Sequence, residues 1–103
     1  MNTKVQISLK EIKDRISSNK KYIQNVFHVN EIGLFGSFVK GKQTRKSDID
    51  ILIDFEKGHK DFFNYMRLKN YIENFLGLEV DLVIKGALKK QLKDNILNEV
   101  EYV

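Results

Sequence analysis

The stretch that most constrains the fold is an apolar run that begins with two carboxylates. Residues 48–55 read DIDILIDF. Side chains alternate between the two faces of a β-strand, so the three isoleucines share one face while Asp48 and Asp50 share the other. Charged side chains are uncommon in buried strands, and two adjacent carboxylates repel each other unless a cation lies between them. The run therefore predicts a core strand with a candidate metal site on its second face.

Helices and strands are predicted on both sides of this run. The Ser8 to Glu11 segment fits a capping box, in which both side chains satisfy free backbone N–H groups, so a helix begins near Ser8. Hydrophobic periodicity and glycine positions set the other boundaries. The expected strands cover residues 32–35, 48–55 and 78–84, and the expected later helices cover residues 59–76 and the segment after Gly86. In the second helix the residues expected to face inward are Phe62, Phe63, Met66, Tyr71, Ile72 and Phe75.

The order of these elements predicts an α/β (α+β) fold. A strand, a crossover helix and another strand imply a parallel pair, which places Asp81 near Asp48 and Asp50 on one face. We expect a small mixed sheet of about three strands, with helices packed mainly on one face. The strand residues expected to face the helices are Ile49, Ile51, Ile53, Val80, Leu82 and Ile84. A chain of 103 residues suits one domain with one core, so residues 1–103 are expected to form a single domain.

Three carboxylates on one face make a site for a hard cation. Mg²⁺ prefers a few carboxylates together with water and phosphate oxygens. Two such ions, about 3.5–4 Å apart, can activate an attacking hydroxyl and stabilise a leaving pyrophosphate. Upstream, Gly36 allows a phosphate to approach the backbone, and Ser37 supplies a hydroxyl and an N–H group. The basic segment from Lys40 to Lys46 adds positive charge, so the chemistry indicated is nucleotidyl or phosphoryl transfer.

Composition limits the classes of partner. The net charge is +4, which favours anionic ligands without requiring a nucleic acid. The chain has no cysteine, which excludes disulfides and thiolate zinc sites and fits a cytoplasmic protein. No apolar run approaches the roughly 20 residues that cross a bilayer, and the first ten residues do not form a secretory signal. We expect a cytoplasmic protein without a membrane partner.

The glycine–serine pair and the carboxylates also carry a family resemblance. Gly36-Ser37, ten intervening residues and then Asp48-Ile49-Asp50 resemble the Gly-Ser-x10-Asp-x-Asp pattern of the DNA polymerase β-like nucleotidyltransferase superfamily. Asp81 fits the third carboxylate of that superfamily. The chain is most similar to the minimal nucleotidyltransferases, also called MntA-like antitoxins, which implies a nucleotidyltransferase palm fold. The segments that resemble the end of this group are residues 79–83, 87–89 and 96–103.

The resemblance implies roles for particular residues. Asp48 and Asp50 would bind two Mg²⁺ ions, and Asp81 would help to bind the catalytic ion and activate the acceptor. ATP would be the substrate, with its triphosphate held by Gly36 and Ser37. Lys40 and Ser47 are further candidates for nucleotide and phosphate binding. The group often has arginine where this chain has Lys40, and lysine cannot make the bidentate contact of arginine.

The resemblance also implies a partner, and two alternatives stay open. Members of the group pair with a HEPN-domain ribonuclease toxin and transfer AMP to a tyrosine hydroxyl of that toxin, which silences it. A first alternative is a non-catalytic antitoxin that neutralises a HEPN protein by contact alone. A second is a nucleic-acid-directed nucleotidyltransferase, which is less favoured because such enzymes usually carry extra domains for a template or primer. For the carboxylates, the structural alternative is a strand end with solvated side chains.

Overall fold

The computed structural model describes residues 7–42 and 48–103. Helices and strands alternate along these residues, and the order is the one expected for an α+β fold. The bounds are α1 (Leu9–Phe27), β1 (Val29–Phe35), α2 (Ser37–Lys40), β2 (Ile49–Phe55), α3 (Phe62–Leu76), β3 (Val80–Ile84), a 3₁₀ turn η1 (Lys85–Ala87), α4 (Lys90–Glu99) and β4 (Glu101–Tyr102).

The strands form one mixed sheet in the order β3-β2-β1-β4. Strands β2 and β3 are parallel, as the crossover predicted, and Asp50 lies directly opposite Asp81. Strands β1 and β2 are antiparallel, with Phe35 opposite Asp50. The expected three strands are confirmed, and β4 is a fourth, which pairs with β1. Its two residues are too few to show an alternating pattern, so the sequence offers no local signal for it.

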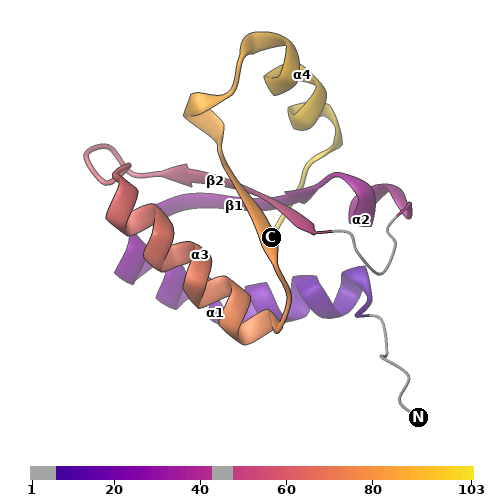
Figure 1. Ribbon diagram of the computed structural model, residues 1–103, viewed down its shortest axis with the longest axis horizontal. Helices are drawn as coiled ribbons and strands as arrows, with labels where there is room; N and C mark the ends of the chain where they lie inside the picture. Colours follow the sequence, from indigo (N-terminus) through magenta and orange to yellow (C-terminus); the bar gives the residue numbers. More distant parts are fainter. Residues whose placement is uncertain (1–6, 43–47) are drawn as a thin grey trace.

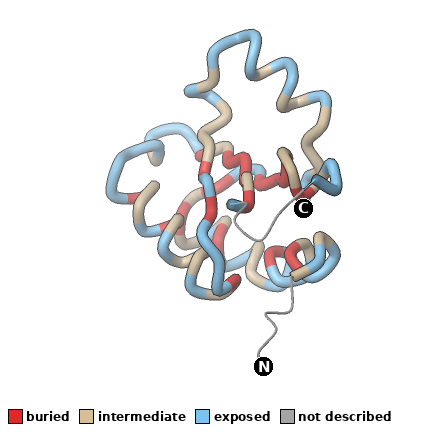
Figure 2. The backbone as a smooth tube through the Cα atoms, turned by 45° about the vertical axis from the view of Figure 1, so that its right-hand side comes forward, coloured by how far each residue is buried: buried red, intermediate tan, exposed pale blue. Residues whose placement is uncertain are grey.

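The core lies between the sheet and two helices. Figure 1 shows α1 and α3 on one side of the sheet and α4 on the other side. Figure 2 shows that buried positions gather along the strands and on the inner sides of the helices. The predicted apolar face of β2 and β3 is confirmed, with Ile84 only partly buried at its edge. The buried members of that face are Ile49, Ile51, Ile53, Val80 and Leu82.

The N-terminal boundary of α1 is set as the sequence predicts. Ser8 is the N-cap, and its hydroxyl accepts a hydrogen bond from the Glu11 backbone N–H at 3.1 Å. Other boundaries differ from the expected ones by a few residues. Strand β1 starts earlier than expected, at Val29, and β3 starts later, at Val80. The last helix begins at Lys90 after a 3₁₀ turn, so the start expected from its periodic leucines is too early.

The expectation that Phe62 and Phe63 face inward is wrong. Helix α3 begins at Phe62 because Asp61 caps it, with its side chain accepting from the Asn64 backbone N–H. The two phenylalanines lie in the first turn and are 70% and 76% exposed. The buried stripe follows every fourth residue instead, which is one face of a helix. Its members are Asn64, Leu68, Ile72 and Leu76, with Tyr71 and Phe75 partly buried beside them.

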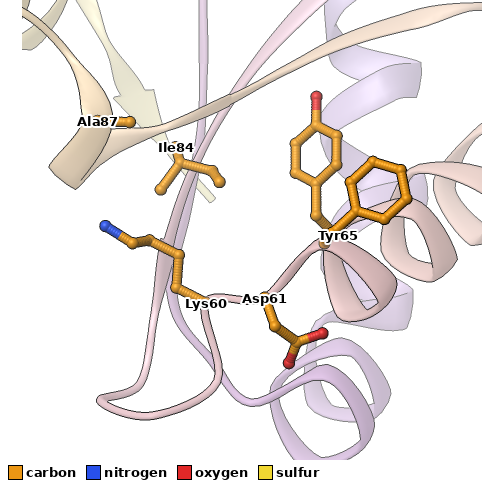
Figure 3. Close-up of a pocket in the computed structure, with 6 residues that line it drawn as sticks. Lys60, Asp61, Tyr65, Ile84 and Ala87 are labelled. Atoms are coloured by element: carbon orange, nitrogen blue, oxygen red, sulfur yellow. The ribbon is translucent and has the colours of Figure 1, made fainter.

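A small pocket lies at the end of β3 remote from Asp81. Its volume is about 250 Å³, and Figure 3 shows the Lys60 side chain extending toward Ile84 and Ala87 across it. The lining residues are Lys60, Asp61, Phe62, Tyr65, Ile84 and Ala87. Among the residues that the structure describes, no helix is both long and apolar enough to cross a membrane.

Asn64 is the buried polar residue whose loss should cost most stability. Its side-chain amide donates to the carbonyl of Phe27 at 2.7 Å and to the carbonyl of His59 at 3.0 Å. We predict that Asn64→Ala lowers the free energy of unfolding by about 1–3 kcal/mol, because it leaves two carbonyls without their donor. Urea denaturation measures the loss. Asn70→Ala, at an exposed position of the same helix, is the control and should change the free energy of unfolding little. Equal losses of stability in both variants would contradict the role of Asn64.

Candidate functional site

The turn between β1 and α2 is shaped by Gly36. This residue has φ 80° and ψ −152°, a conformation that residues other than glycine rarely adopt. A Cβ atom at this position would lie 2.0 Å from Oδ2 of Asp50 and 2.8 Å from its Cγ. Two independent constraints therefore require glycine here: the backbone conformation and the close approach of the Asp50 carboxylate.

Asp50 is the centre of the carboxylate group. It is half-buried on β2, with Phe35 beside it on β1 and Asp81 beside it on β3. Burial raises the pKa of Asp50 to about 6, and the charge of Asp81, a hydrogen bond to Asp81 and the charge of Asp48 contribute to this rise. The backbone N–H of Ser37 donates to the Asp50 carboxylate and opposes the rise in pKa.

The carboxylates meet only in part. Asp50 and Asp81 are brought together as predicted, whereas Asp48 is exposed and acts on Asp50 through its charge. Across residues 7–42 and 48–103, no three carboxylate or imidazole side chains form a ready-made metal cluster. The carboxylate oxygens of Asp50 and Asp81, which lie opposite each other on neighbouring strands, are of the kind that suits Mg²⁺.

Three predicted site residues remain, namely Ser37, Lys40 and Ser47. Ser37 is the first residue of α2, directly after the glycine turn. Lys40 ends α2, where its ammonium pairs with Oε2 of Glu99 at 3.0 Å. Ser47 lies outside the described residues. Asp54, on the same strand as Asp50, lies at the other end of the sheet, opposite Glu31 in the register.

Sequence reasoning missed Glu99. This residue ends α4, and its Oε1 accepts a hydrogen bond from the Gly36 backbone N–H at 3.1 Å. The Lys40 ammonium, which donates to the Glu99 carboxylate, is the main reason that the pKa of Glu99 is lowered. Only the resemblance of the chain end to the minimal nucleotidyltransferases pointed to this segment, and it did not single out Glu99.

A glycine–serine turn held against paired carboxylates on a small mixed sheet defines the nucleotidyltransferase class. The profile of the nucleotidyltransferase domain family matches residues 9–103 of the chain. The chain belongs to this family and, within it, to the MntA-like minimal nucleotidyltransferases.

Similar proteins share both sequence and fold with the chain. The protein adenylyltransferase MntA of Thermococcus cleftensis is 42% identical over 97 residues, which covers 94% of this chain and 97% of that protein. A solved structure provisionally described as a minimal nucleotidyltransferase has a TM-score of 0.82 at 26% identity, covering 95% and 98% of the two chains. The fold also occurs in a complex of tri-AMPylated Shewanella oneidensis HEPN toxin with MNT antitoxin, with a TM-score of 0.64, 21% identity and coverage of 88% and 70%.

The close approach at Gly36 predicts a clear effect of substitution. Gly36→Ala should abolish nucleotide and Mg²⁺ binding, because the new methyl group would displace the Asp50 carboxylate. Gly58→Ala is the matched control, since Gly58 also has a positive φ, of 87°, but a Cβ there would meet no atom within 4 Å. Both variants should lose stability, by about 1 kcal/mol for the backbone strain, and only Gly58→Ala should keep binding. Isothermal titration calorimetry measures the binding; retained affinity in Gly36→Ala would contradict the role of this contact.

The raised pKa of Asp50 predicts how stability depends on pH. The folded-state pKa of about 6 lies above the ordinary value of 3.8, so the folded chain holds this proton more tightly and loses stability as the pH rises from about 4 to 6. Asp50→Asn removes this penalty. Without divalent ions at pH 8, we expect the variant to be more stable than the native protein by about 1 kcal/mol, a figure reduced for solvent screening.

We expect Mg²⁺ to reverse this difference, because an ion held by the Asp50 carboxylate in the folded protein would replace the proton there. Thermal unfolding at pH 8, with and without Mg²⁺, measures both effects. Asp54→Asn is the control and should respond to Mg²⁺ as the native protein does. An equal Mg²⁺ response in Asp50→Asn would show that the ion binds elsewhere.

Proposed function

We propose that the chain is an Mg²⁺-dependent protein adenylyltransferase that transfers AMP from ATP to a hydroxyl of a HEPN-domain toxin and so acts as its antitoxin. The observation that carries this proposal is the contact of the Gly36 turn with Asp50, which is itself paired with Asp81. It brings a glycine–serine turn that phosphate can approach and oxygen ligands that suit a cation to one place.

Each group in the site has a role in this reaction. Ser37 would present its hydroxyl to the triphosphate of ATP, and Gly36, which has no side chain, would let the triphosphate approach the backbone of the turn. Asp50 and Asp81, together with Asp48, are the residues that would hold Mg²⁺. When bound, Mg²⁺ supplies neutralisation of the phosphate charge, which is the main electrostatic demand of nucleotidyl transfer.

The transfer step uses these residues in a simple displacement. The acceptor hydroxyl oxygen bonds to the α-phosphorus of ATP, and the bond from that phosphorus to the bridging oxygen of the β-phosphate breaks, releasing pyrophosphate. Asp81 is exposed at the start of β3, so it is placed to take the proton of the acceptor hydroxyl. Catalysis then rests on holding the two reactants in line.

A second protein is the most suitable acceptor. Asp48 and Asp81 are both exposed, so a large acceptor can reach the carboxylates. The name of the Thermococcus relative and the AMPylated toxin in the Shewanella complex support a protein acceptor and a HEPN partner. The acceptor would be a tyrosine hydroxyl. The use of ATP as the donor supports a location in the cytoplasm.

A second candidate function is neutralisation of the partner by contact alone. The observation in its favour is the exposed aromatic pair Phe62 and Phe63, whose rings lie 5.8 Å apart at the start of α3. Aromatic side chains are enriched at protein interfaces, and this pair can bind a partner whether or not the site is active.

Transfer of labelled AMP distinguishes the two functions. The protein is incubated with ATP labelled at the α-phosphate, Mg²⁺ and a candidate HEPN-domain protein, for which the product of the neighbouring gene is the first choice if it has that domain. We predict labelling of the HEPN protein by the native chain and none by Asp48→Ala or Asp50→Ala, because each removes a carboxylate from the site. Asp54→Asn, which alters a carboxylate at the other end of β2, should transfer normally.

Two results would contradict the adenylyltransferase. One is the absence of transfer by native protein under conditions in which the Thermococcus relative labels its own partner. The other is full protection of cells from the toxin by an Asp48→Asn/Asp50→Asn variant that transfers nothing, which would favour neutralisation by contact.

A further inference from the structure

Glu99 connects the C-terminal end of the chain to the glycine turn. Its Oε1 accepts from the Gly36 N–H at 3.1 Å, and its Oε2 pairs with Lys40 at 3.0 Å. The two carboxylate oxygens therefore bridge the residue before α2 and the last residue of α2. The Glu99 side chain is 24% exposed and the Lys40 side chain is 51% exposed, so the carboxylate is the better shielded of the two partners.

The segment that follows Glu99 packs on β1 and pairs with it, which fixes the position of Glu99 at the end of α4. Val100 follows Glu99 and packs closely on Gly33. A Cβ atom added to Gly33 would lie 2.6 Å from Cγ2 of Val100. Strand β4 then pairs with β1, and the Val103 N–H donates to the carbonyl of Ile32 at 2.9 Å. The same strand that leads into the glycine turn thus also anchors the segment that carries Glu99.

A glycine with a positive φ needs an external constraint to hold one conformation. Glycine has more conformational freedom than any other residue, so Gly36 loses more entropy than its neighbours when its shape is fixed. The hydrogen bond from its N–H to an ionised carboxylate is of the stronger, charge-assisted kind. The lowered pKa of Glu99 keeps that carboxylate ionised.

We infer that Glu99 is a positioning residue that holds the Gly36-Ser37 turn in its nucleotide-binding shape, and that Lys40 holds Glu99 in place rather than binding phosphate. This inference rests on the proposed function, because it concerns the same site. The role of Lys40 then differs from the phosphate binding expected from the sequence. Its ammonium pairs with the Glu99 carboxylate and orients that carboxylate toward Gly36. This pairing also accounts for the departure from arginine at this position, since one Lys40–Glu99 contact does not require a bidentate donor.

A double-mutant cycle tests the inference. Binding of a non-hydrolysable ATP analogue with Mg²⁺ is measured by calorimetry for the native protein, Glu99→Ala, Lys40→Ala and the double variant. We expect each single substitution to weaken binding about tenfold, the usual scale for losing a charge-assisted contact that preorganises a site. The double variant should bind no more than about twofold more weakly than Glu99→Ala, because residues that act through one contact are not additive.

Two further variants separate positioning from general stability. Glu99→Gln keeps an oxygen that can accept from the Gly36 N–H, so its loss of affinity should be smaller than that of Glu99→Ala. It also keeps the test possible if Glu99→Ala does not fold. Glu31→Ala is the control, because it removes an ion pair of similar length, 3.1 Å to Lys85, from the far end of β1, and it should bind with native affinity.

Three results would overturn the inference. Additional tenfold weakening in the double variant would show that Lys40 contacts phosphate independently of Glu99. Tighter binding in Glu99→Ala would show that the carboxylate occupies the place of a phosphate and competes with it. Native affinity in Glu99→Ala would show that the turn needs no support. Failure of the native protein to bind the analogue would instead contradict the proposed function.

Discussion

The contact between the Gly36 backbone and the Asp50 carboxylate is the constraint on which the site depends. The antiparallel register of β1 and β2 places Phe35 opposite Asp50, so the turn that follows Phe35 must pass over this carboxylate. A residue with a Cβ would collide with it at 2.0 Å. The parallel register of β2 and β3 brings Asp81 to the other side of Asp50. Strand register alone thus gathers the candidate phosphate-binding turn and the candidate metal ligands at one end of the sheet.

The carboxylate group and the Gly36 turn cost stability, and the apolar face of the same strands offsets that cost. A half-buried carboxylate beside two others has a raised pKa, and Gly36 has a backbone conformation with a conformational cost. The opposite face of the same strands is wholly apolar and packs against α1 and α3 (Figure 1). Burial of each of these large aliphatic side chains contributes roughly 1.5–3 kcal/mol. The alternation along β2 therefore places core residues on one face and the carboxylates on the other. Such a division is expected where functional residues reduce stability.

Local sequence patterns predicted the parts of the structure that depend on local physics. The alternation from Ile49 to Phe55 and the Ser8 cap were predictable, because strand periodicity and capping involve neighbouring residues. The link between the Gly36-Ser37 pair and the carboxylates was indicated by the family resemblance. The orientation of Phe62 and Phe63 was predicted wrongly. The Asp61 cap is a local signal for the start of α3 at Phe62, but which helix face the sheet buries depends on tertiary packing. Strand β4 and the Glu99 contact were missed because they join residues far apart in sequence; Glu99 and Gly36 are separated by 63 positions. A two-residue strand and one glutamate in an amphipathic helix carry no pattern that reveals a distant partner.

The most direct test of the shared site for metal and nucleotide is anomalous diffraction. Crystals of the protein grown with Mn²⁺ and a non-hydrolysable ATP analogue would show where both ligands lie, since manganese replaces Mg²⁺ on oxygen ligands and scatters anomalously. The expected result is a manganese peak in contact with the carboxylates of both Asp50 and Asp81, with the triphosphate on the Gly36-Ser37 turn. A manganese peak away from Asp50, or a triphosphate bound without contact to this turn, would contradict the account.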